Sequence, residues 1–139
     1  MITIKPFTMA EYDEAVELWK QCEGVRLRES DSREHMAFYL EHNPEMSLVA
    51  YQDERLIANV LCGHDGRRGI IHHLAVHPQF RRRGIANQLV EMCQTKLKAA
   101  GILKSLLIVL NENESGIAFW QNVGWQLRPD IQVMSKVLD

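Results

Sequence analysis

The sequence predicts an α/β fold in which one domain, residues 1–139, is built around a mixed central sheet. Short apolar runs with a period of two residues alternate along the chain with longer runs at helical spacing. The predicted order of elements is β-α-α-β-β-β-α-β-α-β-β, a mixed α/β arrangement. A length of 139 residues suits one domain, and no repeat or linker rich in proline, glycine or serine divides the chain.

The N-terminal third of the chain predicts one strand followed by two helices. Residues 2–5 alternate between apolar and polar side chains, as a short strand does. Thr8 and Glu11 have the spacing of a capping box, and the apolar residues that follow at helical spacing predict a first helix. Asp31 and Glu34 have the same spacing and predict the beginning of a second helix.

Three strands are predicted next. Residues 46–51 and 56–62 are separated by a polar turn, and an Asp65-Gly66 turn leads into a third strand at residues 69–77. This third strand is apolar on both faces around Leu74, which is typical of a strand in the middle of a sheet.

The C-terminal half predicts a long helix, a buried strand, a short helix and a closing pair of strands. The apolar stripe of an amphipathic helix covers residues 85–100, and the continuous apolar run at residues 106–110 has the length of a buried strand. A short helix follows at residues 116–123. Residues 125–127 and 131–137 predict the closing strands.

The segment that joins the third of the middle strands to the long helix carries the chemistry. Within residues 74–86 a buried strand ends, a turn with three arginines follows, and Gly84 opens the helix. Backbone N–H groups at a helix start have no intrahelical partner, and with the helix dipole they bind phosphate or pyrophosphate. Gly84 has no Cβ, so an anion can approach the backbone closely. Neither a P-loop motif nor a dinucleotide-binding fingerprint is present, so these residues alone leave the cofactor open.

The same segment resembles the GNAT superfamily of N-acyltransferases. The family signature is Arg or Gln, two residues, Gly, one residue, then Gly or Ala, and Arg81, Gly84 and Ala86 fit it. The preceding residues 74–78, Leu-Ala-Val-His-Pro, are a common form of the family's fourth strand. Further matches in spacing are Asn113, Gly116, Phe119-Trp120 and Gly124-Trp125. The resemblance spans essentially the whole chain and implies a GNAT-like fold.

The resemblance implies an acyl-CoA, usually acetyl-CoA, as co-substrate. Its pyrophosphate is expected on the backbone of Arg81, Arg82, Arg83, Gly84, Ile85 and Ala86. Its pantetheine is expected along the edge of the fourth strand, at Leu74, Ala75 and Val76. The backbone N–H near Val76 is then the expected oxyanion donor. Asn113 is expected to contact the cofactor from the side of the fifth strand.

The catalytic groups depart from the most frequent family pattern. Trp120 stands where many members have a tyrosine that protonates the leaving thiolate, and an indole N–H does not act as an acid at neutral pH. The fourth strand offers His72 and His73 in place of the usual glutamate. By strand alternation His72 shares a face with Leu74 and Val76, so it is the expected base and His73 is expected to point the other way. For each histidine a hydrogen-bonded core role is the alternative.

The resemblance implies an N-acetyltransferase that moves the acetyl group of acetyl-CoA to a primary amine: a small molecule, a peptide N-terminus or a lysine. Direct attack is expected, because no well-placed nucleophile favours a covalent intermediate. Glu29 is a candidate contact for the acceptor ammonium. A non-catalytic acyl-CoA-binding or sensor protein on the same fold is the alternative, favoured by Trp120 and by the absence of the usual glutamate. An RNA-binding domain rests on the arginines alone, and a net charge of −2 opposes it.

Composition excludes several other classes of protein. With 46% hydrophobic and 24% charged residues, the chain is not disordered, collagen-like or a disulfide scaffold. Its cysteines are three in number and lack C-x-x-C spacing, and its histidines are scattered, which predicts no metal site and a reducing cytoplasm. Residues 1–14 show no signal-peptide pattern, and no apolar run is long enough for a membrane span. The expected partners are acetyl-CoA and an amine, with no membrane and no nucleic acid; a homodimer is one option for assembly.

Overall fold

The computed structural model describes all residues, 1–139. The chain forms two compact parts, Met1–Ile108 and Val109–Asp139, and each is described by itself. The first part contains the whole sheet, in which five strands pair in a mixed parallel and antiparallel arrangement. The α/β fold class with a mixed central sheet is therefore confirmed.

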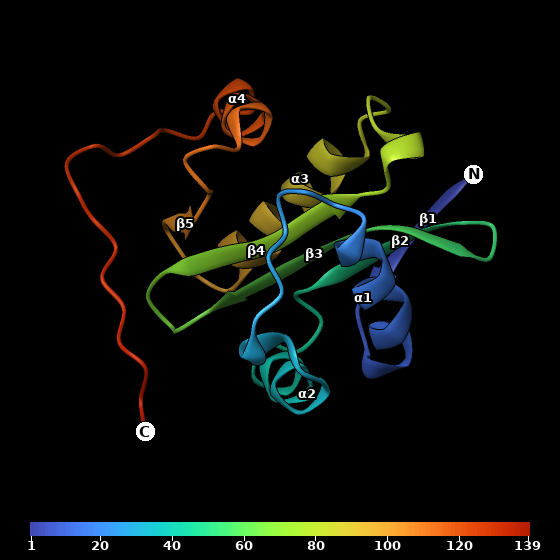
Figure 1. Ribbon diagram of the computed structural model, residues 1–139, viewed down its shortest axis with the longest axis horizontal. Coiled ribbons are helices and arrows are strands. Elements are labelled where there is room, and N and C mark those ends of the chain that lie inside the picture. Colours follow the sequence, from blue (N-terminus) through green and yellow to red (C-terminus); the bar gives the residue numbers. More distant parts are fainter. The chain divides into compact units, whose positions relative to one another are not determined.

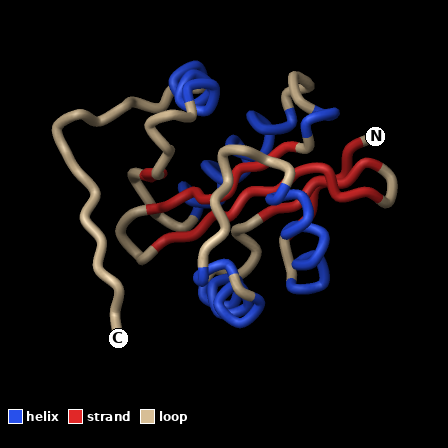
Figure 2. Tube along the Cα trace, viewed as in Figure 1, coloured by secondary structure: helices blue, strands red, loops and turns tan.

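The sheet follows the order of its strands along the chain, β1-β2-β3-β4-β5 (Figures 1 and 2). The strands are β1 (Ile2–Pro6), β2 (Leu48–Gln52), β3 (Arg55–His64), β4 (Gly69–Val76) and β5 (Ser105–Leu107). Neighbouring strands are antiparallel from β1 to β4, whereas β4 and β5 are parallel. The parallel pair is joined by a long helix, as a parallel connection requires.

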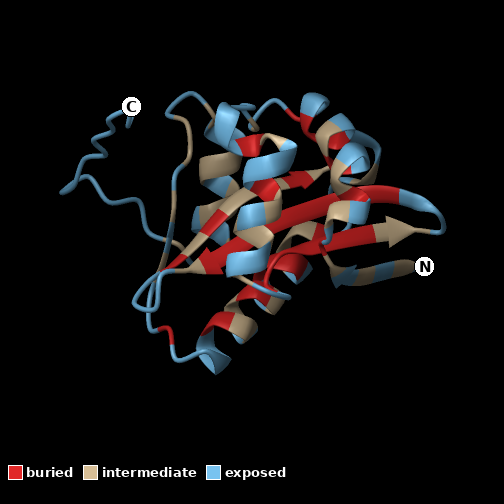
Figure 3. Ribbon diagram, turned by 90° about the horizontal axis from the view of Figure 1, so that it is seen from below, coloured by how far each residue is buried: buried red, intermediate tan, exposed pale blue.

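Three helices of the first part cover the two faces of this sheet. The helices α1 (Tyr12–Lys20) and α2 (Arg33–His42) lie on one face, and α3 (Ile85–Ala99) lies on the other (Figure 1). Three short 3₁₀ turns precede α1, α2 and α3: η1 (Met9–Glu11), η2 (Glu29–Asp31) and η3 (Pro78–Phe80). The helices thus cover both sides of β3 and β4, and β3 is buried along most of its length (Figure 3).

The two predicted capping boxes have different outcomes. In the first, Glu11 Oε1 accepts the backbone N–H of Thr8 at 2.7 Å and Thr8 Oγ1 accepts the N–H of Ala10 at 3.2 Å, so the predicted helix start is confirmed. The second prediction is wrong, because Ser32 caps α2 through the N–H of His35. Asp31 precedes the cap, and its carboxylate bonds elsewhere.

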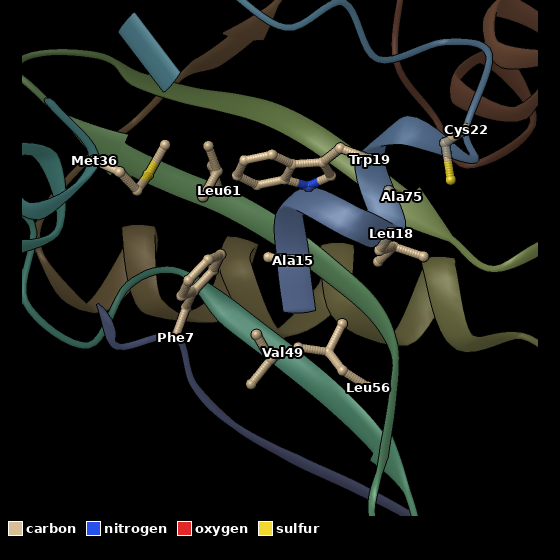
Figure 4. Close-up of a cluster of buried hydrophobic side chains, with 10 residues drawn as sticks. All are labelled: Phe7, Ala15, Leu18, Trp19, Cys22, Met36, Val49, Leu56, Leu61 and Ala75. Atoms are coloured by element: carbon tan, nitrogen blue, oxygen red, sulfur yellow. The ribbon is translucent and has the colours of Figure 1, made fainter. Parts of the chain in front are cut away.

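The core between the sheet and α1 is a single cluster of buried side chains (Figure 4). Its members are Phe7, Ala15, Leu18, Trp19, Cys22, Met36, Val49, Leu56, Leu61 and Ala75. Trp19 is 1% exposed, and its indole N–H donates to Asn59 Oδ1 at 2.8 Å, which satisfies a polar group inside the core. This face of β3 and β4 is therefore held in place by α1.

The two parallel strands pair over a short stretch. Residues Gly69, Ile70 and Ile71 of β4 pair with β5, and beyond Ile71 the edge of β4 has no strand beside it on that side. The strand predicted at residues 106–110 is therefore real but shorter, and it ends at Leu107. The result is an open edge along the C-terminal half of β4.

The second part contains one helix, α4 (Glu114–Asn122). The closing strands predicted at residues 125–127 and 131–137 are absent, so the predicted order of elements is wrong at its C-terminal end. The apolar side chains that produced the alternating pattern are exposed: Leu127, Ile131, Val133, Met134 and Val137. Alternation predicts a strand only where a neighbouring strand can supply backbone partners, and residues 125–137 pair with none.

Candidate active site

The open edge of β4 presents backbone groups that β3 does not use. The N–H of His77 donates to the carbonyl of Ile57 on β3 at 2.8 Å. Hydrogen-bonded and non-hydrogen-bonded pairs alternate along an antiparallel ladder. The neighbouring pair, Val76 opposite Ala58, is therefore not hydrogen-bonded, and the backbone N–H and C=O of Val76 point away from β3. The Val76 carbonyl instead accepts Arg81 Nε at 3.1 Å and the Cys22 thiol at 3.7 Å. The N–H of Val76 is thus directed toward the open edge.

A β-bulge interrupts β4 at its histidines. His72 lies opposite Leu61 and Ala75 lies opposite Asn59, so β4 contains one residue more than β3 across this stretch. His73 has φ +46, a left-handed conformation that is uncommon for a residue with a side chain. The extra residue reverses the alternation between His72 and Ala75.

The bulge overturns the expected orientation of the two histidines. His72 lies across from Leu61, and His73 contacts Trp19, so both rings lie on the face of the sheet that α1 and α2 cover. Their centroids are 6.5 Å apart. The prediction that His72 shares a face with Leu74 and Val76 while His73 points away is therefore wrong, because it assumed an uninterrupted strand.

His73 is paired with a carboxylate from the connection between α1 and α2. Its Nε2 lies 2.8 Å from Asp31 Oδ1, and its ring meets the edge of Trp19 at a centroid distance of 4.9 Å. Burial alone would raise the pKa of Asp31, but the hydrogen bonds from His73 and from the Arg28 N–H outweigh it and lower that pKa. Asp31 is therefore ionised at neutral pH and accepts from His73.

His72 has a different environment. Burial lowers its pKa below the usual 6.5, the neighbouring His73 lowers it further, and Asp31 opposes the shift. Its ring meets Tyr39 of α2 at a centroid distance of 6.2 Å. His72 is thus uncharged at neutral pH. The site therefore contains one histidine with a carboxylate partner and one without.

The beginning of α3 has the features of an anion site. Gly84 is the N-cap residue with φ +79, it provides no side-chain cap, and no acidic residue lies in the first turn. A Cβ at Gly84 would meet no atom within 4 Å, so the backbone is open to a ligand. Arg81, Arg82 and Arg83 are all exposed around it. Free N–H groups, a helix dipole and three cations together suit a diphosphate.

The remaining predicted site residues are Glu29 in the first part and Asn113 and Trp120 in the second part. Glu29 is exposed and begins η2, two residues before Asp31. Asn113 caps α4, where its Oδ1 accepts the N–H of Gly116 at 3.0 Å. Trp120 packs edge-on against Trp125 at 5.1 Å within the second part.

Sequence reasoning missed the partners of His73. The spacing of Asp31 predicts a helix cap, but its carboxylate bonds to His73, and the ring of Trp19 contacts His73 as well. The sequence contains no glycine or proline that marks the bulge at His73. Nowhere do three or more His, Cys, Asp or Glu side chains gather so as to hold a metal ion. The helices also lack the length and apolarity that crossing a bilayer requires.

Comparison with known proteins gives the family of this site. A model of the acetyltransferase (GNAT) family matches residues 12–125. An acetyltransferase from Sodalis glossinidius is 30% identical over 135 residues, which cover 97% of this chain and 94% of that protein. One from Yersinia enterocolitica is 30% identical over 135 residues, covering 97% and 95%. The fold is similar to that of the PaiA N-acetyltransferase from Thermoplasma acidophilum in complex with coenzyme A, with a TM-score of 0.81, 18% identity, and coverage of 92% of this chain and 91% of that one.

These matches bear on the two alternatives that the sequence left open. The family model covers most of the chain, and relatives that match along nearly their whole length are acetyltransferases. The predicted resemblance and the prediction of an enzyme are therefore confirmed. The chain belongs to the acetyltransferase (GNAT) family and is an acetyltransferase.

Proposed function

We propose that this enzyme transfers the acetyl group of acetyl-CoA to a primary amine. The observation that carries the proposal is that the open edge of β4 is followed along the chain by the start of α3, which has no side-chain cap. Pantetheine contains amide groups that can pair with a strand edge, and the diphosphate of coenzyme A suits free N–H groups at a helix start. A structural neighbour binds coenzyme A on the same fold.

The proposal distributes the cofactor over two adjoining segments. Residues 81–86 hold the diphosphate through backbone N–H groups and arginine side chains, and residues 74–76 of β4 pair with pantetheine. The N–H of Val76, directed toward the open edge, then stabilises the negative charge that develops on the thioester oxygen. Asn113 as a further contact to the cofactor stays a prediction.

The acceptor amine must lose a proton before it attacks. An alkyl ammonium resembles lysine, whose pKa is about 10.4, so the amine arrives protonated at neutral pH. The proposal assigns its deprotonation to the histidines of β4. Trp120 supplies no acid, and the leaving thiolate takes its proton from the amine nitrogen after attack. Coenzyme A, with a thiol like that of cysteine and a pKa of about 8.5, is a fair leaving group without a dedicated acid.

The acceptor is a small amine, a peptide N-terminus or a lysine side chain, and Glu29 is a candidate contact for its positive charge. Glu29 is exposed on η2, close in sequence to Asp31. A carboxylate there favours an ammonium over a neutral acceptor.

The test is thiol release from acetyl-CoA across a panel of acceptors. The panel contains a diamine, a polyamine, a peptide with a free N-terminus and no lysine, and a lysine peptide with a blocked N-terminus. We expect thiol release with at least one of them, together with a product that has gained one acetyl group by mass spectrometry. The matched control is the same acceptor with its amine already acetylated. Coenzyme A binding without transfer to any free amine would contradict the proposal.

A further inference from the structure

Two segments that are far apart in the sequence meet at His73. Asp31 ends η2 in the connection between α1 and α2, and His73 lies at the bulge of β4. Nevertheless, Asp31 Oδ1 and His73 Nε2 are 2.8 Å apart, and the two side chains are only 10% and 17% exposed. A charge-assisted hydrogen bond in such a poorly solvated place is stronger than one at the surface.

Two further hydrogen bonds hold the carboxylate and the carbonyl oxygen of Asp31. Its Oδ2 accepts the backbone N–H of Arg28 at 2.9 Å, and its carbonyl oxygen accepts the Tyr12 hydroxyl at 2.6 Å. Both ends of the residue are therefore fixed, one within its own turn and the other to α1. A carboxylate oriented in this way can in turn orient a partner.

The His73 ring is fixed by its neighbours as well. The Nε2–H of His73 donates to Asp31 Oδ1. Trp19 packs against the His73 ring, and the indole N–H of Trp19 donates to Asn59 Oδ1. An ionised carboxylate only accepts, so Nε2 carries a hydrogen, and in the neutral form of the ring Nδ1 then carries the lone pair. The left-handed backbone at His73 is retained although it is unfavourable, which is frequent where a side chain must be aimed.

We propose that Asp31 is the positioning residue of the reaction and that it presents Nδ1 of His73 as the base toward the acceptor amine. The inference rests on the proposed transfer to a primary amine and names which histidine acts. The titratable groups that face His73 are Asp31 from η2 and His72 from β4, whereas α1 contributes Trp19, which does not titrate.

The proton balance is complete with these groups. His73 Nδ1 takes one proton from the ammonium, and the Asp31 carboxylate offsets the charge of the imidazolium. The free amine nitrogen attacks the thioester carbonyl, a C–N bond forms, and the C–S bond breaks with its electron pair on sulfur. The second proton of the nitrogen passes to the thiolate. His73 then releases its proton to solvent, so one amide, one thiol and one proton result.

The decisive variant is Asp31→Asn, because it keeps the shape and removes the charge. An amide can offer its NH₂ to Nε2, which would place the hydrogen on Nδ1 and leave no lone pair for the amine. We expect kcat with an alkylamine to fall by roughly 10²-fold at neutral pH, within the usual range for general-base catalysis. The KM for acetyl-CoA should not change.

The matched control is Asp65→Asn. Asp65 is exposed in the turn before β4, and its carboxylate accepts the backbone N–H groups of Arg67 and Arg68. The pKa of Asp65 is lowered, like that of Asp31, but here by the backbone N–H groups of Arg68 and Arg67, and Asp65 lies at the opposite end of β4 from the end of the strand at Val76. This variant should retain wild-type kcat and the wild-type pH profile.

Two readouts separate positioning from a merely structural role. The deficit of Asp31→Asn should shrink at high pH, and it should nearly vanish with an aromatic amine, which is unprotonated at neutral pH and needs no base. A deficit that is equal for both acceptors and at every pH would overturn the proposal. Thermal unfolding of each variant identifies a loss of fold.

A measurement without turnover decides the case if no acceptor is found. Nitrogen chemical shifts of His73 in the wild type should show hydrogen on Nε2 in the neutral ring, and Asp31→Asn should shift that population toward Nδ1. Hydrogen on Nδ1 in the wild type would overturn the positioning role, whatever the panel of amines shows. A wild type with the expected tautomer but no transfer to any amine would contradict the proposed function and leave the role of Asp31 in orienting His73 intact.

Discussion

The start of α3 provides the sharpest test of the proposed coenzyme A site. Gly84 has φ +79, and a Cβ at this position would meet no atom within 4 Å. Gly84→Asp therefore adds a carboxylate at the helix start without a steric clash inside the protein. We expect that carboxylate to repel the diphosphate and to compete with it for the free N–H groups.

The expected size of the effect follows from two contributions. A helix N-terminus favours an anion by up to about 2 kcal/mol when the geometry is partly buried. Two charges 4 Å apart interact by about 1 kcal/mol in water and by about 4 kcal/mol at an effective dielectric constant near 20. A loss of roughly 3 kcal/mol in binding free energy is therefore expected, which corresponds to about a 100-fold increase in Kd.

Thermal unfolding with coenzyme A measures this loss. At a ligand concentration of about 100 times the wild-type Kd, binding adds about 2.7 kcal/mol to the free energy of unfolding. For a domain of this size 1 kcal/mol moves Tm by about 4 °C, so the wild type should gain roughly 10 °C. In Gly84→Asp the same concentration only matches Kd, and the gain should fall to about 2 °C.

Gly66→Asp is the matched control for this experiment. Gly66 also has a positive φ, +93, and open space around its Cβ position, but it lies in the turn before β4. Both variants carry the same new charge and a left-handed residue that costs about 1–2 kcal/mol. Only Gly66→Asp should keep the full ligand-induced gain in Tm. A full gain in Gly84→Asp as well would refute the placement of the diphosphate at α3.

Two further predictions concern stability. A Cβ at Gly116 would clash with Asn113 Nδ2, so Gly116→Ala should displace the cap of α4. The loss of the cap costs about 1 kcal/mol and cancels the gain in helix propensity of about 1 kcal/mol. In an Asn113→Ala background the gain should appear in full in denaturant unfolding. The lowered pKa of His72 means that the unfolded chain binds more protons, so the free energy of unfolding should fall as pH drops below about 6.5, and His72→Gln should flatten that fall. The lowered pKa of Asp31 acts only below about 3.8, where its stabilising ionisation is lost. A pH profile unchanged in His72→Gln, or an equal gain from Gly116→Ala in both backgrounds, would contradict these accounts.

The local structure of the proposed anion site could be predicted from the sequence because its determinants are local. The strand end, the arginine turn, Gly84 and the apolar stripe of α3 are contiguous along residues 74–97, and the structure has all of them in the predicted order. Helix starts and strand ends depend on propensity, capping and periodicity within a few residues. Nothing distant is needed to form the free N–H groups at the start of α3.

The orientation of the histidines could not be predicted because a bulge depends on pairing. One extra residue in β4 relative to β3 places His72 and His73 on the same face, and strand periodicity alone assigns them to opposite faces. The residue that adopts the left-handed conformation is His73, a residue type with no strong turn signal. The prediction of closing strands is wrong for a related reason. Alternation at residues 131–137 indicates a potential to pair with a strand and not the presence of a partner strand.

Asp31 matches the sequence pattern of a helix cap but does not cap α2. Its spacing to Glu34 suits a capping box, but a carboxylate that bonds to His73 and to the Arg28 N–H has no oxygen directed at the first turn of α2. Ser32 takes the cap one residue later, and its short hydroxyl completes the helix start. The shift of the cap by one residue leaves the Asp31 carboxylate available to β4. Ser32, directly after Asp31, is therefore the sequence feature that allows the Asp31 carboxylate to bond to His73 instead of capping α2.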